Sequence, residues 1–400
     1  MRLVHLSDLH LGFRQYQRLT PGGINQREAD VAASFRRAVD KVIELRPDVV
    51  VIAGDLFHNV RPTNPAILHA FGQLSHLRQS VPDAIVVIIA GNHDTPRSSE
   101  TGCILRLFVQ LGVEVVDDAP RRLSFPEREL SILAIPDVPG TRPALVPDPG
   151  VRHNVLLLHG EIEGVLPASA AATDRASLEI SKEELGAHRW TYVALGHYHV
   201  YRQVAPNAYY SGSLDYTSAN AWGELHEERA AKLPGKGFIE QDLATGAHRF
   251  HPLPPGRELV DLPPVLAGGL SIAEVDAAIG AAVDACPGGI DDKIVRLVLR
   301  DVPRHVTREL NHKAIREYRR RALHFLLDPR KPQVVRTVGQ GAPGKRPSLA
   351  DTLREKLSTR AIEADIDRER LVSLGLHYLS LAESEHAGTE NVDGQPVEAQ

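Results

Sequence analysis

Five apolar segments of this sequence are each followed directly by residues that commonly bind metal ions. Each segment is rich in valine, isoleucine or leucine and is short enough to be a buried strand. The groups that follow are Asp8-x-His10, Gly54-Asp55, Gly91-Asn92-His93-Asp94, His159-Gly160-Glu161 and Gly196-His197-x-His199. Because the ends of neighbouring strands in an open α/β sheet gather at one crevice, this order predicts one site built from distant parts of the chain.

The residue types at these positions predict two metal ions. Carboxylate, imidazole and amide-oxygen ligands without a thiolate suit Mn²⁺, Fe²⁺ or Zn²⁺. The seven candidate ligands are Asp8, His10, Asp55, Asn92, His159, His197 and His199. Seven side chains are too many for one ion, whereas two ions about 3.5–4 Å apart and bridged by one carboxylate would use them all. Each group alone is a weak signal, because Gly-Asp is often a turn, so the combination carries the interpretation.

Residues 1–255 are expected to form one α/β domain. Apolar residues at helical spacing predict helices over about 27–45, 65–79 and 103–111, which alternate with strands. The predicted strands are 2–6, 48–53, 84–90, 114–116, 130–135, 154–158, 192–195, 209–211, 237–242 and 248–252. Since the later strands crowd together without long helices, we expect a β-sandwich of two sheets flanked by helices.

Composition changes after residue 255 and predicts three further parts and a tail. We expect a small α/β domain over 256–335, a Gly- and Pro-rich linker over 336–347, a helical segment over 348–385 and a disordered tail over 386–400. The two helices of 348–385 have apolar positions but no core of their own, so we expect them to dock on a partner. The arginines at 316–321 either follow nucleic-acid phosphates or form a solvated helix face.

Charge and cysteine content narrow the class of protein. A formal net charge of -5 argues against a protein that coats nucleic acid by bulk electrostatics, although local basic patches are compatible with it. The two cysteines, Cys103 and Cys286, are expected to be reduced thiols and not a disulfide or a metal site. With no signal peptide and no apolar run long enough to span a membrane, we expect a soluble cytoplasmic protein.

The five groups resemble the five motifs of the calcineurin-like metallophosphoesterase superfamily. Within it, residues 4–12 (VHLSDLHLG) and 53–58 (AGDLFH) resemble the SbcD-type DNA double-strand-break nucleases, called meiotic recombination eleven nucleases in eukaryotes. Residues 210–216 (YSGSLDY) and 236–238 (KGF) are similar to the same family. The close resemblance covers residues 1 to about 245, and the C-terminal third is similar in layout only.

The resemblance implies a role for each candidate site residue. One ion would be held by Asp8, His10 and His199, the other by Asn92, His159 and His197, and Asp55 would bridge them. A water activated by both ions would attack phosphorus. His93 would protonate the leaving sugar oxygen or stabilise the transition state, and Asp94 would orient His93. His58 matches a histidine near the phosphate in one branch of the family, where other members carry aspartate.

The resemblance also implies a function and partners. It indicates a Mn²⁺-dependent DNA nuclease of a double-strand-break repair complex, with three-prime to five-prime exonuclease action on duplex ends and endonuclease action on single strands. The domain over 256–335 would cap the nuclease domain and touch DNA, the C-terminal helices would bind an SbcC-type coiled-coil ATPase, and the nuclease domain would dimerise. Two alternatives stay open: a metallophosphoesterase acting on a non-DNA phosphodiester or phosphomonoester, and a non-catalytic scaffold that binds DNA ends.

Overall fold

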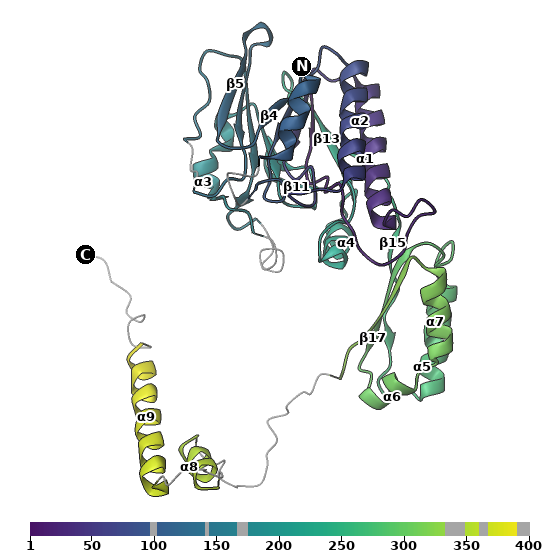
Figure 1. Ribbon diagram of the computed structural model, residues 1–400, viewed down its shortest axis with the longest axis vertical. Coiled ribbons are helices and arrows are strands. Elements are labelled where there is room, and N and C mark those ends of the chain that lie inside the picture. The colour runs from purple at the N-terminus through teal and green to yellow at the C-terminus, as the bar shows by residue number, and fades with distance from the viewer. Residues whose placement is uncertain (97–101, 141–143, 166–174, 333–348, 360–366, 390–400) are drawn as a thin grey trace, which may run out of the picture. The chain divides into compact units, whose positions relative to one another are not determined.

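The computed structural model describes residues 1–96, 102–140, 144–165, 175–332, 349–359 and 367–389 (Figure 1). The chain divides into two compact units, Met1–Pro332 and Gln333–Gln400. Among the described residues, no helix has both the length and the apolar character needed to cross a membrane.

The first sheet of the larger unit carries three of the five predicted ligand groups. Its six strands run in the order β14-β13-β1-β2-β3-β4. Their bounds are β1 Arg2–Leu6, β2 Val49–Ala53, β3 Ile85–Ile89, β4 Glu114–Val116, β13 Gly237–Asp242 and β14 His248–Pro252. Strands β1 to β4 are parallel, so β1, β2 and β3 end at the same edge. Beyond β1, β13 pairs antiparallel with β1, and β14 pairs antiparallel with β13.

The second sheet carries the other two groups. Its order is β11-β12-β10-β7-β6-β5. The bounds are β5 Arg121–Phe125, β6 Leu130–Ile135, β7 His153–His159, β10 Tyr192–Gly196, β11 Arg202–Ala205 and β12 Ala208–Tyr210. Strands β6, β7, β10 and β12 are parallel, and the edge strands β5 and β11 are antiparallel to their neighbours.

The two sheets pack face to face, as the predicted sandwich requires. Side chains from both, among them Val51, Ile89, Val155 and Leu157, form one buried apolar cluster between the sheets. The predicted fold class, a β-sandwich flanked by helices, is therefore confirmed.

Helices α1 (Gln26–Leu45) and α2 (Asn64–Ser80) cover the outer face of the first sheet. The predicted helix over 103–111 is instead the 3₁₀ helix η1, Ile104–Leu111. Its fully buried side chains, Leu105 and Phe108, are three positions apart, which matches the three residues per turn of a 3₁₀ helix. The outer face of the second sheet packs against the short helices α3 (Lys182–Leu185) and η3 (Ala187–Arg189).

Several short elements were not predicted. Among them are the edge strands β5 and β11, the 3₁₀ helix η2 (Pro126–Arg128), the paired strands β8 (Glu161–Ile162) and β9 (Glu179–Ile180), and helix α4 (Ala221–Ala230). Both β8 and α4 matter below, because each carries a glutamate that contacts a candidate ligand.

After the sandwich, the chain builds a smaller sheet with its own core. Strand β17 (Ile294–Arg300) pairs in parallel with β15 (Leu259–Asp261), β16 (Val265–Leu266) and β18 (His324–Pro329). Helices α5 (Ile272–Asp284), α6 (Arg304–Glu309) and α7 (His312–Arg321) contribute to the apolar cluster around this sheet. This is the region predicted as the small α/β domain, and its boundary near residue 255 stays a prediction.

Helices α8 (Leu349–Thr359) and α9 (Arg368–Thr389) belong to the smaller unit. A Cβ atom added at Gly375 of α9 would come within 4 Å of Leu353 and Leu357 of α8, so the two helices are in contact. Helix α9 ends at Thr389, four residues past the predicted end of the helical segment at 385. The tail was predicted to begin at 386, but residues 386–389 are the end of α9. The predicted linker over 336–347 and the rest of the predicted tail, 390–400, lie outside the described residues.

Candidate metal centre

The structure brings all seven candidate ligands together between the two sheets. Four of them have left-handed backbone conformations, with φ of 54° at Asp8, 48° at His10, 52° at Asp55 and 107° at His197. Such conformations cost free energy and persist where the surroundings hold them. Here the N–H groups of Asp8 and His10 donate to the carbonyls of Gly54 and Asp55 at 3.1 and 2.9 Å, so the loops after β1 and β2 hold each other.

The first ligand group is Asp8, His10 and His199. One potential ligand atom from each lies within 4.8 Å of the others. The Nε2 atoms of His10 and His199 are 2.9 Å apart. Burial, followed by the neighbouring histidines, holds the pKa of His10 well below its usual value, so this ring is neutral at physiological pH and able to offer a lone pair.

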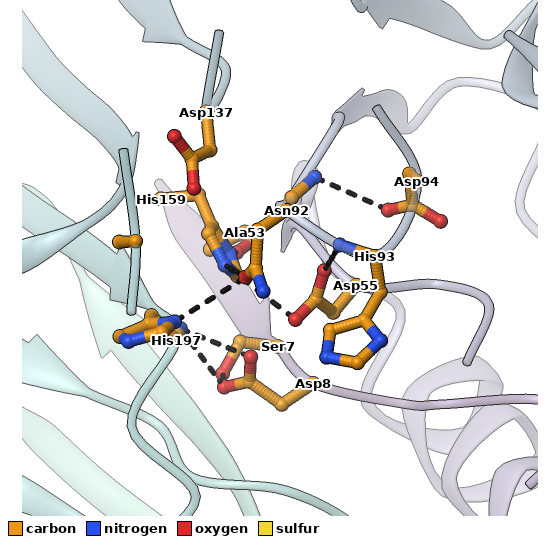
Figure 2. Close-up of polar contacts among 12 residues, drawn as sticks. Ser7, Asp8, Ala53, Asp55, Asn92, His93, Asp94, Asp137, His159 and His197 are labelled. Carbon is orange, nitrogen blue, oxygen red and sulfur yellow. Dashed lines mark hydrogen bonds and ion pairs between the residues drawn. The ribbon is translucent and has the colours of Figure 1, made fainter. Parts of the chain in front are cut away.

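The second group is Asn92, His159 and His197. Figure 2 shows Asn92 close to both rings, with its Oδ1 atom 3.0 Å from His159 Nε2 and 3.3 Å from His197 Nδ1. The His159 Nδ1–H donates to the Ala53 carbonyl at 2.8 Å, which leaves the Nε2 lone pair directed at the group.

Asp55 lies between the two groups. Its Oδ2 atom is 3.7 Å from His10 Nε2 and 3.5 Å from His159 Nε2. Asp8, Asp55 and His159 also form a cluster whose ligand atoms are all within 4.8 Å. This position suits a bridging carboxylate, although the ligand roles of all seven residues stay predictions.

A glycine allows the two sheets to approach at this edge. A Cβ atom on Gly196, at the end of β10, would lie 1.7 Å from the Ala53 carbonyl oxygen and 2.9 Å from His159 Nδ1. Since no side chain fits in that space, the glycine of the Gly-His-x-His group is required by the contact between β10 and β2.

His93 and His58 lie beside the ligand groups and line an adjoining pocket. The His93 N–H donates to Asp55 Oδ1 at 2.9 Å, and the His93 ring Nδ1 is 2.8 Å from the His58 carbonyl oxygen. The His58 Nδ1 atom is 3.3 Å from His10 Nδ1, and the His58 and His93 rings stack with centroids 5.2 Å apart. The same pocket is lined by Asn92, Thr95, Asp137 and Arg175.

Asp94 does not occupy the position predicted for it. Its carboxylate accepts the backbone N–H groups of Leu56, Phe57 and Gly91 at 3.1, 3.0 and 3.2 Å, and the His93 ring Nδ1 is instead held by the His58 carbonyl. Figure 2 shows the two side chains pointing in different directions. A short aspartate side chain commonly accepts nearby backbone N–H groups, here those of its own loop and of the loop after β2. Asp94 therefore joins the loops after β2 and β3. Burial, followed by the charge of Asp55, raises the pKa of Asp94 to about 7.

Two glutamates without a predicted role contact candidate ligands. Glu161 Oε1 is 3.3 Å from His197 Nε2, and Glu224 Oε1 is 3.3 Å from His199 Nδ1. Burial lowers the pKa of His197, but Glu161, followed by Asp55 and Asp8, raises it overall. Burial opposes ionisation of Glu224, yet Lys236 and His199 bring the pKa of Glu224 down to about 2. Glu161 was visible in the sequence beside His159, whereas Glu224 gave no signal because its helix was not predicted.

The donor set fits a pair of divalent cations. Its members are imidazoles with one ring nitrogen directed inward, two buried carboxylates and one amide oxygen. Borderline divalent ions accept this mixture of nitrogen and oxygen, and carboxylates so close together need positive charge to balance them.

Comparison with known proteins gives the family and its relatives. The family model described as Calcineurin-like phosphoesterase matches residues 1–228, more than half of the chain. The DNA double-strand break repair protein Mre11 of Methanococcus maripaludis is 29% identical over 255 residues, which cover 61% of this chain and 63% of that protein. The protein of the same name from Methanocaldococcus jannaschii is 26% identical over 257 residues, with the same two coverages. The one from Sulfurisphaera tokodaii is 30% identical over 211 residues, 50% of this chain and 49% of that protein. The matches thus span less than two thirds of these relatives.

Proposed function

This chain belongs to the calcineurin-like phosphoesterase family, and from that premise we propose that it is the metal-dependent nuclease of a DNA double-strand-break repair complex. The family is the one that the five sequence motifs predicted, so that prediction is confirmed. The names of the relatives support DNA as the substrate. The observation that carries the proposal is the meeting of two complete ligand groups across Asp55, with His93 bonded to that same carboxylate.

We propose that Asp8, His10 and His199 hold one Mn²⁺ ion, that Asn92, His159 and His197 hold the other, and that Asp55 contacts both. When bound, two divalent cations supply positive charge to the phosphate oxygens and make a water a stronger nucleophile at neutral pH. The residues around them fix the geometry, since the His159 tautomer is set by the Ala53 carbonyl and the Asp55 carboxylate by the His93 amide.

His93 is proposed as the residue that delivers a proton to the leaving sugar oxygen. Because its Nδ1–H is held by the His58 carbonyl, Nε2 is the ring nitrogen that would face the substrate. His58 stacks on His93 and lines the same pocket, so it would fix the ring and border the phosphate. Asp94 would act at a distance, by holding the loop that carries His93.

The regions outside the sandwich support the proposed partners. On α7, Arg316 and Arg319 are exposed, whereas Arg320 and Arg321 pair with Glu317 and Asp291. We propose that the exposed arginines follow the phosphates of DNA ends or single strands.

Two apolar residues of helix α9, Leu374 and Tyr378, are each more than half exposed. Apolar side chains presented on a helix suit a helix-in-groove contact, which supports docking on an SbcC-type ATPase. A homodimer of the nuclease domain is part of the same proposal and would be measured by sedimentation.

The experiment is Mn²⁺-dependent degradation of end-labelled duplex and single-stranded DNA by the full chain, with and without the ATPase. Bis-para-nitrophenyl phosphate serves as a small substrate. His93→Ala should abolish DNA cleavage while leaving Mn²⁺ binding intact. His76→Ala, which removes an exposed histidine of α2, is the matched control and should cleave normally.

The outcomes separate the alternatives. DNA cleavage that His93→Ala removes supports the nuclease. If only the small diester is hydrolysed, even with the ATPase present, the substrate is not DNA. If neither is hydrolysed and DNA ends are still bound, regardless of Mn²⁺ or His93, the protein is a scaffold.

A further inference from the structure

We propose that Glu161 and Glu224 are positioning residues that fix the two histidines of the His197-x-His199 pair, one glutamate for each metal ion. The inference rests on the proposed metal site, but not on DNA being the substrate. It is drawn from the contacts on the outward ring nitrogens of the two histidines, which the five motifs do not assign.

His197 is held at both ring nitrogens. Its Nδ1 atom faces Asn92 Oδ1 at 3.3 Å, within the second ligand group, and its Nε2 atom faces Glu161 Oε1 at 3.3 Å. Glu161 is itself fixed, because the same Oε1 atom accepts the Ala176 N–H at 3.0 Å and because β8 pairs with β9. A carboxylate on Nε2 keeps the proton there and leaves the Nδ1 lone pair for a cation.

In His199 the roles of the two ring nitrogens are exchanged. Its Nε2 atom faces His10 Nε2 at 2.9 Å, within the first ligand group, and its Nδ1 atom is 3.3 Å from Glu224 Oε1. The Nδ1 atom is buried and has no aligned hydrogen bond within the described chain. Glu224 is the carboxylate that faces this nitrogen, so we infer that it accepts the Nδ1–H.

Lys236 anchors Glu224 from the other side. The Lys236 ammonium is buried, lies 2.5 Å from Glu224 Oε2 and 3.1 Å from Glu228 Oε1, and donates to the His199 carbonyl at 2.8 Å. The same lysine therefore holds the glutamate and the backbone of the histidine. A long acidic side chain on the short helix α4 is thereby directed at one point of the ligand group.

The two histidines thus offer different ring nitrogens to the two ion sites, Nδ1 from His197 and Nε2 from His199. Both histidines follow the end of β10, and His197 has φ of 107°, so the alternation of a strand does not set the direction of their rings. Opposite tautomers, each enforced by its own glutamate, let one His-x-His pair serve two separate ions.

The test is Mn²⁺ binding to the metal-free full chain, measured by calorimetry and by the electron paramagnetic resonance signal of free Mn²⁺. Glu161→Ala and Glu224→Ala should each weaken one of the two binding steps about 10–100-fold. Glu161→Gln and Glu224→Gln should lose less, because the amide oxygen still accepts the ring N–H. Nitrogen-15 spectra of the histidine rings should show a Nε2–H tautomer for His197 and a Nδ1–H tautomer for His199.

Glu44→Gln is the matched control. Glu44 is an exposed glutamate of α1 that pairs with Lys41, so Mn²⁺ binding should be unchanged. Thermal unfolding in chelator verifies that each variant is folded, and the glutamine variants decide the question if an alanine variant is not. Unchanged Mn²⁺ affinity in folded Glu161 and Glu224 variants, or identical tautomers for the two histidines, would overturn the proposal. If the glutamate variants bind Mn²⁺ more weakly than wild type but wild type cuts no DNA, the proposal stands and only the nuclease function is rejected.

Discussion

The Asp55 carboxylate accepts the backbone N–H of His93 at 2.9 Å, so the candidate bridging ligand and the candidate proton donor are bonded to each other. Asp55 follows β2 and His93 follows β3, and these strands are parallel neighbours with aligned ends. One oxygen of the carboxylate is occupied by this bond, while the other faces both ligand groups. A change at Asp55 is therefore expected to affect both proposed ion sites and the loop that carries His93.

Asp55→Asn should weaken both Mn²⁺ binding steps at least about tenfold, because a neutral amide replaces the carboxylate that both ion sites share. Calorimetric titration of the metal-free protein measures the two steps separately. The comparison variant is Asp8→Asn, which should weaken mainly the step that involves His10 and His199. If Asp55→Asn and Asp8→Asn weakened the same Mn²⁺ binding steps to the same extent, a bridging role for Asp55 would be contradicted.

Gly196→Ala should lower the free energy of unfolding by about 3 kcal/mol or more, because the added Cβ atom would lie 1.7 Å from the Ala53 carbonyl oxygen. Urea unfolding of the metal-free protein gives the value. Gly72 is an exposed position of α2, and a Cβ atom added there has no atom within 4 Å. Gly72→Ala should therefore raise the free energy of unfolding by roughly 0.5–1 kcal/mol. A tolerated Gly196→Ala variant would show that β10 and β2 can separate at this edge.

The ligand groups could be predicted because each follows a strand whose apolar run is continuous. Strands β2 and β7 are buried along their whole length, so the sequence marks both the strand and its end. The edge strands β5 and β11 were missed because they carry arginines and are only partly buried, which removes the apolar signal.

Contacts between side chains that are far apart along the chain could not be predicted from the sequence. Helix α4 has no apolar periodicity, and its buried Glu224 and Glu228 are held by ion pairs with Lys236, which lies outside the helix. The bonding of Asp94 to the loop after β2 depends in the same way on the packing of two loops that are 38 residues apart. The spacing of residues predicts where strands end, but it does not predict which neighbouring group a short side chain will bond.

Asp215→Asn should lower the free energy of unfolding by about 3–5 kcal/mol, because Arg27 is almost fully buried and would lose its closest charged partner. Asp215 lies 2.8 Å from Arg27 and also accepts the Gly256 N–H at 2.6 Å, so it ties α1 to the chain that leaves the sandwich.

Urea unfolding in chelator measures the loss at Asp215. Glu44→Gln, which breaks the exposed pair with Lys41, is the matched control and should cost less than about 1 kcal/mol. If the two substitutions cost the same, the buried network does not hold α1 in place.

His5 should make the stability of the metal-free protein depend on pH. The ring is fully buried, with Nδ1 at 3.0 Å from the Tyr192 hydroxyl and Nε2 at 3.2 Å from the Leu195 carbonyl oxygen, so both nitrogens of the neutral form are used. Burial lowers the pKa of His5 to about 3. In the unfolded chain the pKa of a histidine is about 6.5.

Between these two values the unfolded state binds a proton that the folded state does not. The stabilisation from His5 is therefore complete above about pH 6.5 and is lost as the pH falls toward 3, by up to about 1.4 kcal/mol per pH unit. From pH 7 to pH 5 the loss is about 2 kcal/mol, and in His5→Gln the pH dependence should be shallower by that amount. Urea unfolding in chelator at pH 7, 6 and 5 gives the two slopes, with His76→Gln as an exposed histidine control that keeps the wild-type slope. If the free energy of unfolding changed with pH equally in wild type and His5→Gln, the folded protein would accommodate a charged His5. That result would contradict the argument that both ring nitrogens of the neutral form are used.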